Sequence, residues 1–281
     1  MPAPLGVTGS TGQVGGRIAR LLAAAGAEQR LVVRTPARAP LLPGTTVAAA
    51  SYLDRDAVRR ALDGLDVVLM VSAAEAENRL DEHRAFVDAA ADAGVRHLVY
   101  ISFFGAAPDA TFTLARDHHV TEQHIEQSGM AWTHVRDNLY ADFFSMMAGD
   151  DGVIRGPADD GRVSAVAQDD VAAAAVTAVL LEPAPHEGRT YSLTGPEALT
   201  LTEVAATMSR SLGRHYTFMD ETVEEAYASR ASCGAPGWQL DAWVSTYTAI
   251  ASGELAGVTG DVERLTGHPP MSLADLLGPT Y

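Results

Sequence analysis

The segment 117–123, DHHVTEQ, places two adjacent histidines beside acidic and amide side chains. A histidine exchanges protons near neutral pH, so His118 or His119 could donate a proton to a substrate. His118 and Glu122 are four residues apart and could also share one side of a helix as metal ligands. The segment lacks an H-E-x-x-H pattern and a third ligand, so we predict no metal site. Proton donation and an ordinary solvated helix surface remain as the two interpretations.

A glycine-rich segment near the N-terminus has a second pattern with chemical meaning. Gly9, Gly12 and Gly15 follow the spacing G-x-x-G-x-x-G, between a short apolar run and a helical repeat of apolar residues. In a dinucleotide-binding loop these glycines allow a tight turn, close approach of the backbone to a pyrophosphate, and packing of the helix on the strand. The phosphates lie at the helix N-terminus, where free N–H groups bind anions. We predict such a site here rather than a purely structural turn.

Two arginines near the end of the second apolar run indicate which dinucleotide is bound. An acidic residue there would bind the ribose 2′-hydroxyl of NAD, but the chain has VVRTPAR over 32–38. The forked guanidinium groups of Arg34 and Arg38 suit the 2′-phosphate of NADP(H). The alternative is two solvated arginines at a sheet edge. We favour NADPH because the acidic residue is missing.

Short apolar runs alternate with helical patterns through the first half of the chain. The expected strands are 4–9, 30–34, 45–51, 66–72, 97–105 and 131–137, with a later one at 188–195. Strands that are apolar without interruption are typical of a parallel sheet covered by helices on both faces. The sequence therefore predicts an α/β fold, a Rossmann-type doubly wound parallel sheet with a smaller, mostly helical C-terminal substrate lobe.

The second half of the chain has a different pattern. A turn-rich segment at 149–162 precedes an alanine-rich helix from Asp170, and Thr200 with Glu203 forms a capping-box pattern. The expected helices with clear bounds are 54–65, 83–94, 117–128, 221–230 and 238–254. We predict an NADP(H)-binding domain over 1–150, to which 164–194 returns. Residues 195–281 together with 151–163 are predicted to form the substrate lobe.

Composition excludes several classes of partner. The 281 residues have a net charge of −16, which argues against binding nucleic acid or anionic lipid, since both need a basic surface. No apolar run is long enough to span a bilayer, so we expect no membrane association. The single cysteine, Cys233, cannot form an internal disulfide and fits a reducing cytoplasm.

The chain resembles the NmrA-like atypical short-chain dehydrogenase/reductases, most of all the bacterial type 2 NAD(P)H:quinone oxidoreductases and triphenylmethane reductases. The matching segments are VTGSTGQVG, VVRTPAR, VLMVSAAE, HRAFVDAAADAGVRHLVYIS, DHHVTEQHIEQSGMAWTHVRDNLY and HEGRTYSLTGPEALTLTEVA. The resemblance implies that Arg34 binds the 2′-phosphate and that Ser72 lies near the ribose and nicotinamide. It also implies that the pyrophosphate is lined by Gly9, Ser10, Thr11, Gly12, Gln13 and Val14.

The usual catalytic pair of this fold is missing. Short-chain dehydrogenases use Tyr-x-x-x-Lys with an upstream serine, but all 20 basic residues here are arginine. By the resemblance, Ser102 occupies the serine region, His119 the tyrosine position and Gln123 the lysine position. Hydride transfer to a quinone asks less of the protein, because the substrate is already electrophilic and orientation supplies most of the effect. His118 or His119 is then the candidate proton donor.

Aromatic and polar residues at later strand ends are candidates for a substrate pocket. Asn138 and Tyr140 follow the sixth expected strand, and Phe103 with Phe104 ends the fifth; packing in the core is the alternative for each aromatic residue. Aromatic side chains of the late helices, such as Trp243, could close the pocket or form a homo-oligomer interface.

We therefore predict an NADPH-dependent reductase of a small conjugated or aromatic electrophile, with a quinone as the leading substrate. The alternatives are a redox-sensing regulator that binds NADP(H) without turnover, and a tailoring reductase or isomerase of secondary metabolism.

Overall fold

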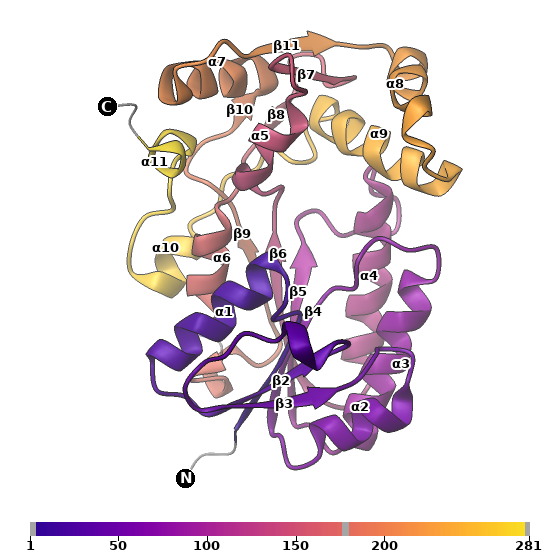
Figure 1. The fold of residues 1–281 in the computed structure, drawn as a ribbon, viewed down its shortest axis with the longest axis vertical. Helices are drawn as coiled ribbons and strands as arrows, with labels where there is room; N and C mark the ends of the chain where they lie inside the picture. The colour runs from indigo at the N-terminus through magenta and orange to yellow at the C-terminus, as the bar shows by residue number, and fades with distance from the viewer. Residues whose placement is uncertain (1–3, 176–179, 279–281) are drawn as a thin grey trace. The chain divides into compact units, whose positions relative to one another are not determined.

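The structure, a computed structural model, describes residues 4–175 and 180–278 (Figure 1). The chain forms two compact units. The first consists of Met1–Phe103, Asp117–Arg136 and Gln168–Tyr191, and the second of Phe104–Arg116, Asp137–Ala167 and Ser192–Tyr281. Within the second unit, Thr111 donates from its main chain and its hydroxyl to Glu254, at 2.9 and 2.5 Å. This contact joins 104–116 to the segment after α9 (Gly237–Ala251) within that unit. The predicted bounds of a nucleotide-binding domain and a substrate lobe stay predictions.

A seven-stranded sheet has the order β3-β2-β1-β4-β5-β6-β9. The strands are β1 (Leu5–Thr8), β2 (Gln29–Val33), β3 (Thr45–Ala49), β4 (Val67–Val71), β5 (His97–Phe103), β6 (Ala131–Asp137) and β9 (Arg189–Leu193). β2 pairs in parallel with β1 and β3, and β4 pairs in parallel with β1 and β5. The doubly wound sheet is therefore present as the alternation of strands and helices predicts.

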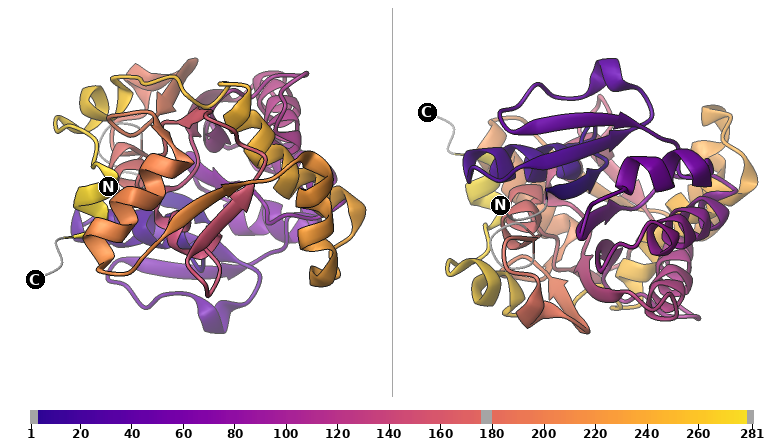
Figure 2. Two further views of the ribbon diagram at one scale, coloured as in Figure 1. Left: turned by 90° about the horizontal axis from the view of Figure 1, so that it is seen from above. Right: turned by 90° about the horizontal axis from the view of Figure 1, so that it is seen from below.

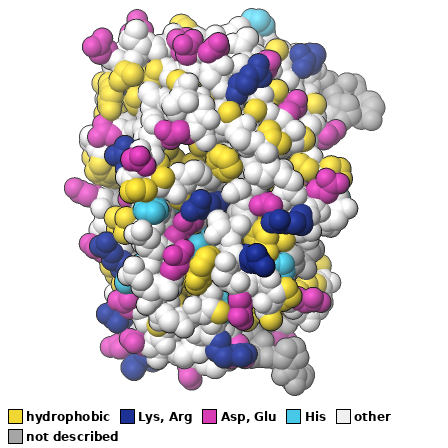
Figure 3. Space-filling view, turned by 180° about the vertical axis from the view of Figure 1, so that it is seen from behind, with side chains coloured by type: hydrophobic (Ala, Val, Ile, Leu, Met, Phe, Trp, Pro, Cys, Tyr) yellow, Lys and Arg dark blue, Asp and Glu magenta, His cyan; other side chains and the backbone are white. Residues whose placement is uncertain are grey.

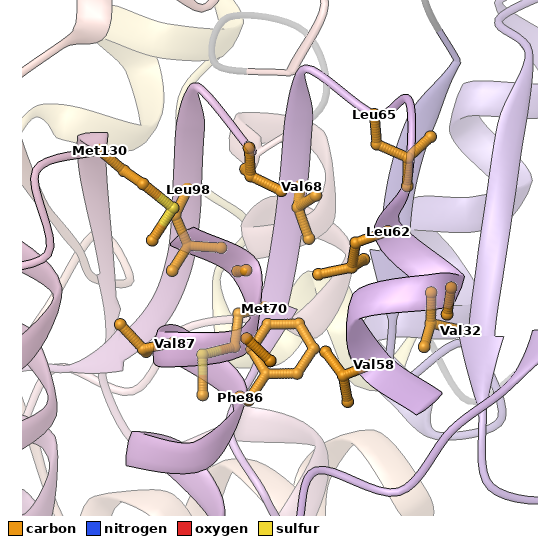
Figure 4. Packing of buried hydrophobic residues seen from close by; sticks show 14 of the residues in the cluster. Val32, Val58, Leu62, Leu65, Val68, Met70, Phe86, Val87, Leu98 and Met130 are labelled. Atoms are coloured by element: carbon orange, nitrogen blue, oxygen red, sulfur yellow. The ribbon is translucent and has the colours of Figure 1, made fainter. Parts of the chain in front are cut away.

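Helices cover both faces of this sheet (Figures 1 and 2). On one face α1 (Gln13–Ala24) packs against α6 (Gln168–Ala174), and on the other α2 (Arg55–Leu62) packs against α3 (Arg79–Asp92). The second face holds a core in which Phe86 of α3 and Leu62 of α2 lie over Val68 and Met70 of β4 (Figure 4). Residues 176–179, which would continue the expected alanine-rich helix, lie outside the described residues.

Local capping signals set several helix ends as the sequence predicts. The Asp54 side chain accepts from the Ala57 N–H at 2.9 Å at the start of α2. Thr200 and Glu203 form the predicted capping box of α7 (Leu201–Leu212). The helix expected at 117–128 is α4 (Thr113–Glu126), and it begins four residues earlier because the Thr113 N–H is bound by the Ser245 hydroxyl at 3.2 Å.

The second unit contains two small strand pairs besides its helices. β7 (Val153–Gly156) pairs in parallel with β11 (Thr217–Asp220), and β8 (Arg162–Val163) pairs antiparallel with β10 (Leu199–Thr200). Its helices are α5 (Phe144–Met147), α7, α8 (Val223–Arg230), α9 (Gly237–Ala251), α10 (Asp261–Thr266) and α11 (Leu273–Leu277). The segment 149–162, expected to be rich in turns, therefore contains β7 and the first residue of β8.

The surface is acidic, and its basic side chains are dispersed. On the face shown in Figure 3, acidic and arginine side chains are interspersed, and the described residues form no continuous basic stripe there. Among the helices in the described ranges, none combines the length and apolar character needed to cross a membrane.

Candidate functional site

The carboxyl ends of β1 and β4 form the switch point of the sheet. From β1 the chain passes through α1 to β2, whereas β4 pairs with the opposite edge of β1. Ligands of open α/β sheets bind outside the carboxyl ends of the strands at this point, because the flanking connections diverge there. The segments that follow β1 and β4 therefore delimit the candidate cofactor site, and both belong to the first unit.

The loop after β1 has the geometry that the glycine spacing predicts. Gly9 has a φ of +66°, and the Gly12 N–H donates to the Gly9 carbonyl O at 2.8 Å, which closes a tight turn. Gly12 then caps α1 without a side chain that could accept from the first turn, and that turn contains no acidic residue. Free N–H groups at the start of a helix attract anions, so this end of α1 suits a phosphate.

Gly15 lets α1 pack directly on the end of β1. A Cβ atom at this position would lie 2.4 Å from the Gly9 carbonyl O and 2.9 Å from the Thr8 carbonyl O. Both oxygens belong to the main chain and cannot rotate aside, so any side chain would push the helix away from the loop. A Cβ atom added at Gly12 would lie 3.3 Å from its nearest neighbour, the Gly9 carbonyl O. Packing therefore explains Gly15, while the part of Gly12 in approaching a pyrophosphate stays a prediction.

Polar groups around this loop have the chemistry of a dinucleotide site. Ser10 is 3% exposed, and its hydroxyl has no hydrogen-bond partner among the described residues. Arg34 follows β2, Arg38 lies in a 3-10 turn, and both are exposed without an ion pair inside the described ranges. An unpaired buried hydroxyl is costly, so a ligand that pairs with it gains affinity. Ser10 fits a pyrophosphate oxygen, and the two arginines fit a 2′-phosphate.

A tyrosine that the sequence did not single out locks the two strand ends together. The Tyr52 hydroxyl lies 2.6 Å from Thr8 Oγ1 and 2.6 Å from the Val71 carbonyl O, and the Val71 N–H donates to Thr8 Oγ1 at 2.9 Å. Burial raises the pKa of Tyr52, which keeps the hydroxyl protonated. Ser72 follows immediately and is half-buried, so its predicted place beside the ribose and nicotinamide depends on this lock.

Ser102, predicted as a catalytic residue, lies in a buried ion-pair cluster. Its hydroxyl donates to Glu122 Oε1 at 2.6 Å, and Arg136 donates from Nε and Nη2 to the two Glu122 oxygens at 2.8 and 2.6 Å. Ser102 is fully buried and the Glu122 side chain is 4% exposed. The serine proton is therefore used inside the protein, where it joins β5 to α4.

Glu122→Leu is expected to lower the free energy of unfolding by about 3 kcal/mol, because it leaves the Arg136 guanidinium without its buried partner. Urea unfolding measures this loss. Arg84→Ala is the control, since its ion pair with Asp81, at 4.0 Å, is exposed and should contribute less than about 1 kcal/mol. Equal losses in the two variants would show that the Ser102–Glu122–Arg136 cluster does not stabilise the fold.

His118 is buried, and both of its ring nitrogens are occupied. Arg79 Nη2 lies 2.8 Å from His118 Nε2, and Tyr100 Oη lies 2.9 Å from Nδ1. Arginine can only donate, so Nε2 accepts and the ring proton is on Nδ1, directed at Tyr100. Burial, followed by the nearby positive charge of Arg79, holds the pKa of His118 well below its usual range. These contacts leave His118 no ring N–H free for a substrate, so the geometry does not support it as proton donor.

Stability should fall as the pH drops below about 6.5, the ordinary pKa of an unfolded histidine. Burial lowers the folded-state pKa of His83 as well as His118, so the folded protein binds fewer protons than the unfolded chain in acid. Each such histidine contributes up to about 1.4 kcal/mol per pH unit. Urea midpoints between pH 7.5 and 5 measure the slope. The slope should be smaller in His118→Gln than in the wild type. A flat profile in the wild type would contradict neutral buried histidines.

His119 and Gln123 lie beside the packed face of α4 rather than on it. The buried positions of this helix include Ala115, His118, Glu122 and Ile125, which recur at helical spacing. His119 is half-buried without a side-chain hydrogen bond to the described residues, and Gln123 is exposed. Both therefore keep free polar groups, and their roles as proton donor and ribose contact stay predictions.

The residues predicted to line a substrate pocket divide between the two units. Phe103 is 7% exposed in the first unit, and its ring centroid lies 6.1 Å from that of His118. In the second unit, Asn138 is 1% exposed and donates to Ser164 Oγ and the Leu255 carbonyl O, each at 3.0 Å. These bonds give Asn138 a structural part there.

Phe104 and Tyr140 also belong to the second unit. Phe104 lies close to Gly257, where an added Cβ would meet its Cζ at 3.0 Å. The Tyr140 hydroxyl donates to Asp137, and its ring meets Phe143 edge-on with centroids 5.3 Å apart. The contact of these two residues with a substrate stays a prediction. In neither described range do three or more His, Cys, Asp or Glu side chains gather in an arrangement that could hold a metal ion.

Comparison with known proteins identifies the family. A family model described as NAD(P)H-binding matches residues 9–182. The chain belongs to this NAD(P)H-binding family. It is 32% identical to quinone oxidoreductase 2 of Escherichia coli over 96% of each chain. It is 37% identical to the (4-alkanoyl-5-oxo-2,5-dihydrofuran-3-yl)methyl phosphate reductase of Streptomyces griseus, over 96% of this chain and 95% of that enzyme.

A solved structure of a relative has the same fold. The E. coli NADPH-dependent quinone oxidoreductase, in complex with NADPH, superposes with a TM-score of 0.89 at 31% identity, over 97% of this chain and 98% of that one. These matches confirm the predicted resemblance to the NmrA-like reductases and the Rossmann-type fold. The protein is an NAD(P)H-dependent oxidoreductase, and NAD(P)H is its cofactor.

Proposed function

We propose that the protein transfers hydride from NADPH to a quinone or a related small conjugated electrophile. Binding of NADPH is supported mainly by the loop after β1. There Gly9, Gly12 and Gly15 suit a phosphate site, and the buried Ser10 hydroxyl has no hydrogen-bond partner among the described residues. The substrate class is supported by the relatives: the E. coli enzyme is named for quinones, and the Streptomyces enzyme for an unsaturated lactone. In both substrate classes a carbonyl activates the molecule toward hydride.

The residues of the chain would bind and orient rather than activate by strong acid–base chemistry. NADPH supplies a hydride from its nicotinamide ring when bound. The N-terminus of α1 and Ser10 would hold the pyrophosphate, and Arg34 with Arg38 the 2′-phosphate. Ser72 would contact the ribose on the nicotinamide side. In this arrangement the nicotinamide end of the cofactor would lie beside the segment after β4.

Proton delivery is assigned to His119 in this proposal. The chain has no lysine, and His118 and Ser102 are engaged in internal hydrogen bonds. His119 is next along α4, and its imidazole has no side-chain partner among the described residues. A reduced quinone also takes protons from water, so His119→Gln should lower turnover only modestly, by less than about tenfold.

The test is NADPH oxidation by the purified protein against a panel of acceptors. The panel contains a benzoquinone, a naphthoquinone, an azo dye and an unsaturated lactone, each with a protein-free control. We expect turnover with at least one quinone, and faster turnover with NADPH than with NADH. Tight binding of NADPH without oxidation by any acceptor would contradict the reductase and support the regulatory alternative. Turnover with the lactone alone would show that the substrate is an unsaturated lactone and not a quinone.

We also propose a cytoplasmic location, supported by the single cysteine. Cys233 is exposed as a free thiol, which suits a reducing compartment. Fractionation of the native host, followed by detection of the protein, tests this; recovery in a secreted or membrane fraction would contradict it.

A further inference from the structure

The main-chain polar groups of Ala73, just after β4, are both bound by side chains of α3. The Ala73 N–H donates to His83 Nε2 at 2.9 Å, and Arg79 Nε donates to the Ala73 carbonyl O at 3.1 Å. Arg79 is 4% exposed and His83 is fully buried. A helix that follows the strand therefore holds this one peptide segment at both of its hydrogen-bonding groups. We call Arg79 and His83 the Ala73 clamp.

The clamp is itself held by α4. The Arg79 guanidinium lies 3.3 Å from the Asp117 carboxylate through Nη1 and 2.8 Å from His118 Nε2 through Nη2. His83 Nδ1 lies 2.8 Å from Thr121 Oγ1, which donates to the Asp117 carbonyl O at 2.7 Å. Because Nε2 of His83 accepts from Ala73, Nδ1 is its protonated nitrogen, and Thr121 fixes that tautomer. Each donor and acceptor of the clamp thus has one orientation.

Stability alone does not explain this cluster. Burying a guanidinium and two imidazoles is costly, and well-packed apolar side chains at such positions are often as stable or more so. The segment after a strand is ordinarily a surface loop whose backbone is solvated. Here the same backbone is bound by buried polar side chains, which fix its position more narrowly than water would.

Ala73 follows β4, next to the candidate cofactor site, so a rigid backbone at this position could serve hydride transfer. The loop after β1 suits the pyrophosphate, and the end of β2 suits the 2′-phosphate of the adenosine half. Since β4 lies on the other side of β1 from β2, the segment after β4 borders the opposite half of the dinucleotide, which carries the nicotinamide. Hydride transfer needs the donor and acceptor carbons in close alignment, so the wall behind the nicotinamide has to be rigid.

We propose that Arg79 and His83 are positioning residues for hydride transfer: through the main chain of Ser72 and Ala73 they fix the surface on which the nicotinamide end of NADPH rests. This inference rests on the proposed function. The clamp touches neither cofactor nor substrate, so it acts on the geometry of the reacting pair and leaves the anchoring of the phosphates unchanged. Its loss should lower kcat much more than it weakens NADPH binding.

The first test compares two variants of His83 with a matched control. His83→Leu removes the acceptor for the Ala73 N–H, whereas His83→Gln can present its Oε1 in the place of Nε2. We expect kcat to fall about tenfold in His83→Leu, with the Kd of NADPH changed less than about threefold, and to recover at least half in His83→Gln. The control is His97→Leu. His97 is 3% exposed and is the first residue of β5, at the end of the sheet away from the candidate cofactor site; its Nε2 lies 2.8 Å from Thr133 Oγ1. Its loss should therefore reduce stability without changing kcat.

A second readout separates the clamp from the proposed reaction. The nicotinamide fluorescence of bound NADPH reports how firmly that ring is held, whether or not turnover occurs. We expect lower anisotropy in His83→Leu than in the wild type or His97→Leu. If the wild type binds NADPH but does not oxidise it, the proposed function is wrong. The anisotropy alone then tests whether the Ala73 clamp holds the nicotinamide ring. If the wild type does not bind NADPH, both ideas are overturned.

The clamp is overturned if His83→Leu keeps the kcat and the anisotropy of His97→Leu. Should His83→Leu fail to fold, Thr121→Val replaces it. This variant is nearly isosteric and removes only the hydroxyl that fixes the His83 tautomer, so a fall in kcat of about threefold is expected. An unchanged kcat in Thr121→Val would then overturn the proposal.

Discussion

Gly15→Ala is expected to weaken NADPH binding by about tenfold or more. The added Cβ would lie 2.4 Å from the Gly9 carbonyl O and 2.5 Å from its carbonyl carbon, where no side-chain rotation can relieve the overlap. Overpacking of this kind costs about 1–3 kcal/mol, and the strain is relieved by moving α1 away from the turn that shapes the phosphate site. Calorimetric titration with NADPH measures the affinity, and urea unfolding measures the accompanying loss of stability.

Gly237→Ala is the matched control for this substitution. Gly237 is the first residue of α9, and a Cβ there would meet nothing within 4 Å. We expect this variant to bind NADPH like the wild type and to be equally or slightly more stable. If Gly15→Ala bound NADPH as tightly as Gly237→Ala does, the close approach of α1 to the phosphate loop would have no part in cofactor binding.

Arg34→Ala is expected to reduce the preference for NADPH over NADH by about 10- to 100-fold, the value of a lost charge-assisted hydrogen bond to a phosphate. Arg34 is exposed at the end of β2, and among the described residues no acidic side chain competes for it. Its loss should weaken NADPH binding and leave NADH binding nearly unchanged, because NADH lacks the 2′-phosphate. The ratio of the two dissociation constants measures the effect.

Arg59→Ala removes the same charge from another exposed site and serves as the control. Arg59 lies on α2, where its side chain is 57% exposed and paired with Asp56 at 3.5 Å. It should leave the ratio unchanged. An Arg34→Ala ratio equal to that of Arg59→Ala would exclude Arg34 as the 2′-phosphate contact, and the same pair of measurements on Arg38→Ala would then test the second arginine.

The sequence predicted those parts of the fold that depend on neighbours along the chain. The glycine spacing, the Asp54 cap and the Thr200–Glu203 capping box are local, and each appears as expected. The pairing of β7 with β11 was missed because Val153 meets Thr217, and no local pattern in a turn-rich segment indicates so distant a partner. The early start of α4 was missed for the same reason, since the Ser245 hydroxyl binds its first N–H.

In the candidate site, too, the sequence predicted the features that depend on neighbouring residues and missed those that depend on distant ones. The phosphate loop and Arg34 could be predicted as a cofactor site because the residues that suggest it are neighbours in the sequence, and their contacts with NADPH stay predictions. The Ala73 clamp could not, because a main-chain N–H and a histidine ten residues later show no relation until α3 folds over β4. One signal was available and not used: Ala115 and Ile125 mark the apolar face of α4, and His118 and Glu122 share it at helical spacing. Placed on a buried face, they are expected to bond internally.

Hydride transfer from NADPH to a conjugated acceptor can be measured directly. The most direct measurement is the initial rate of quinone reduction with NADPH and with NADPH deuterated at the transferred position of C4. We expect NADPH oxidation well above the protein-free rate, slowed by deuterium at one of the two C4 positions only. A rate equal to that of the protein-free control, in protein shown to bind NADPH, would contradict it.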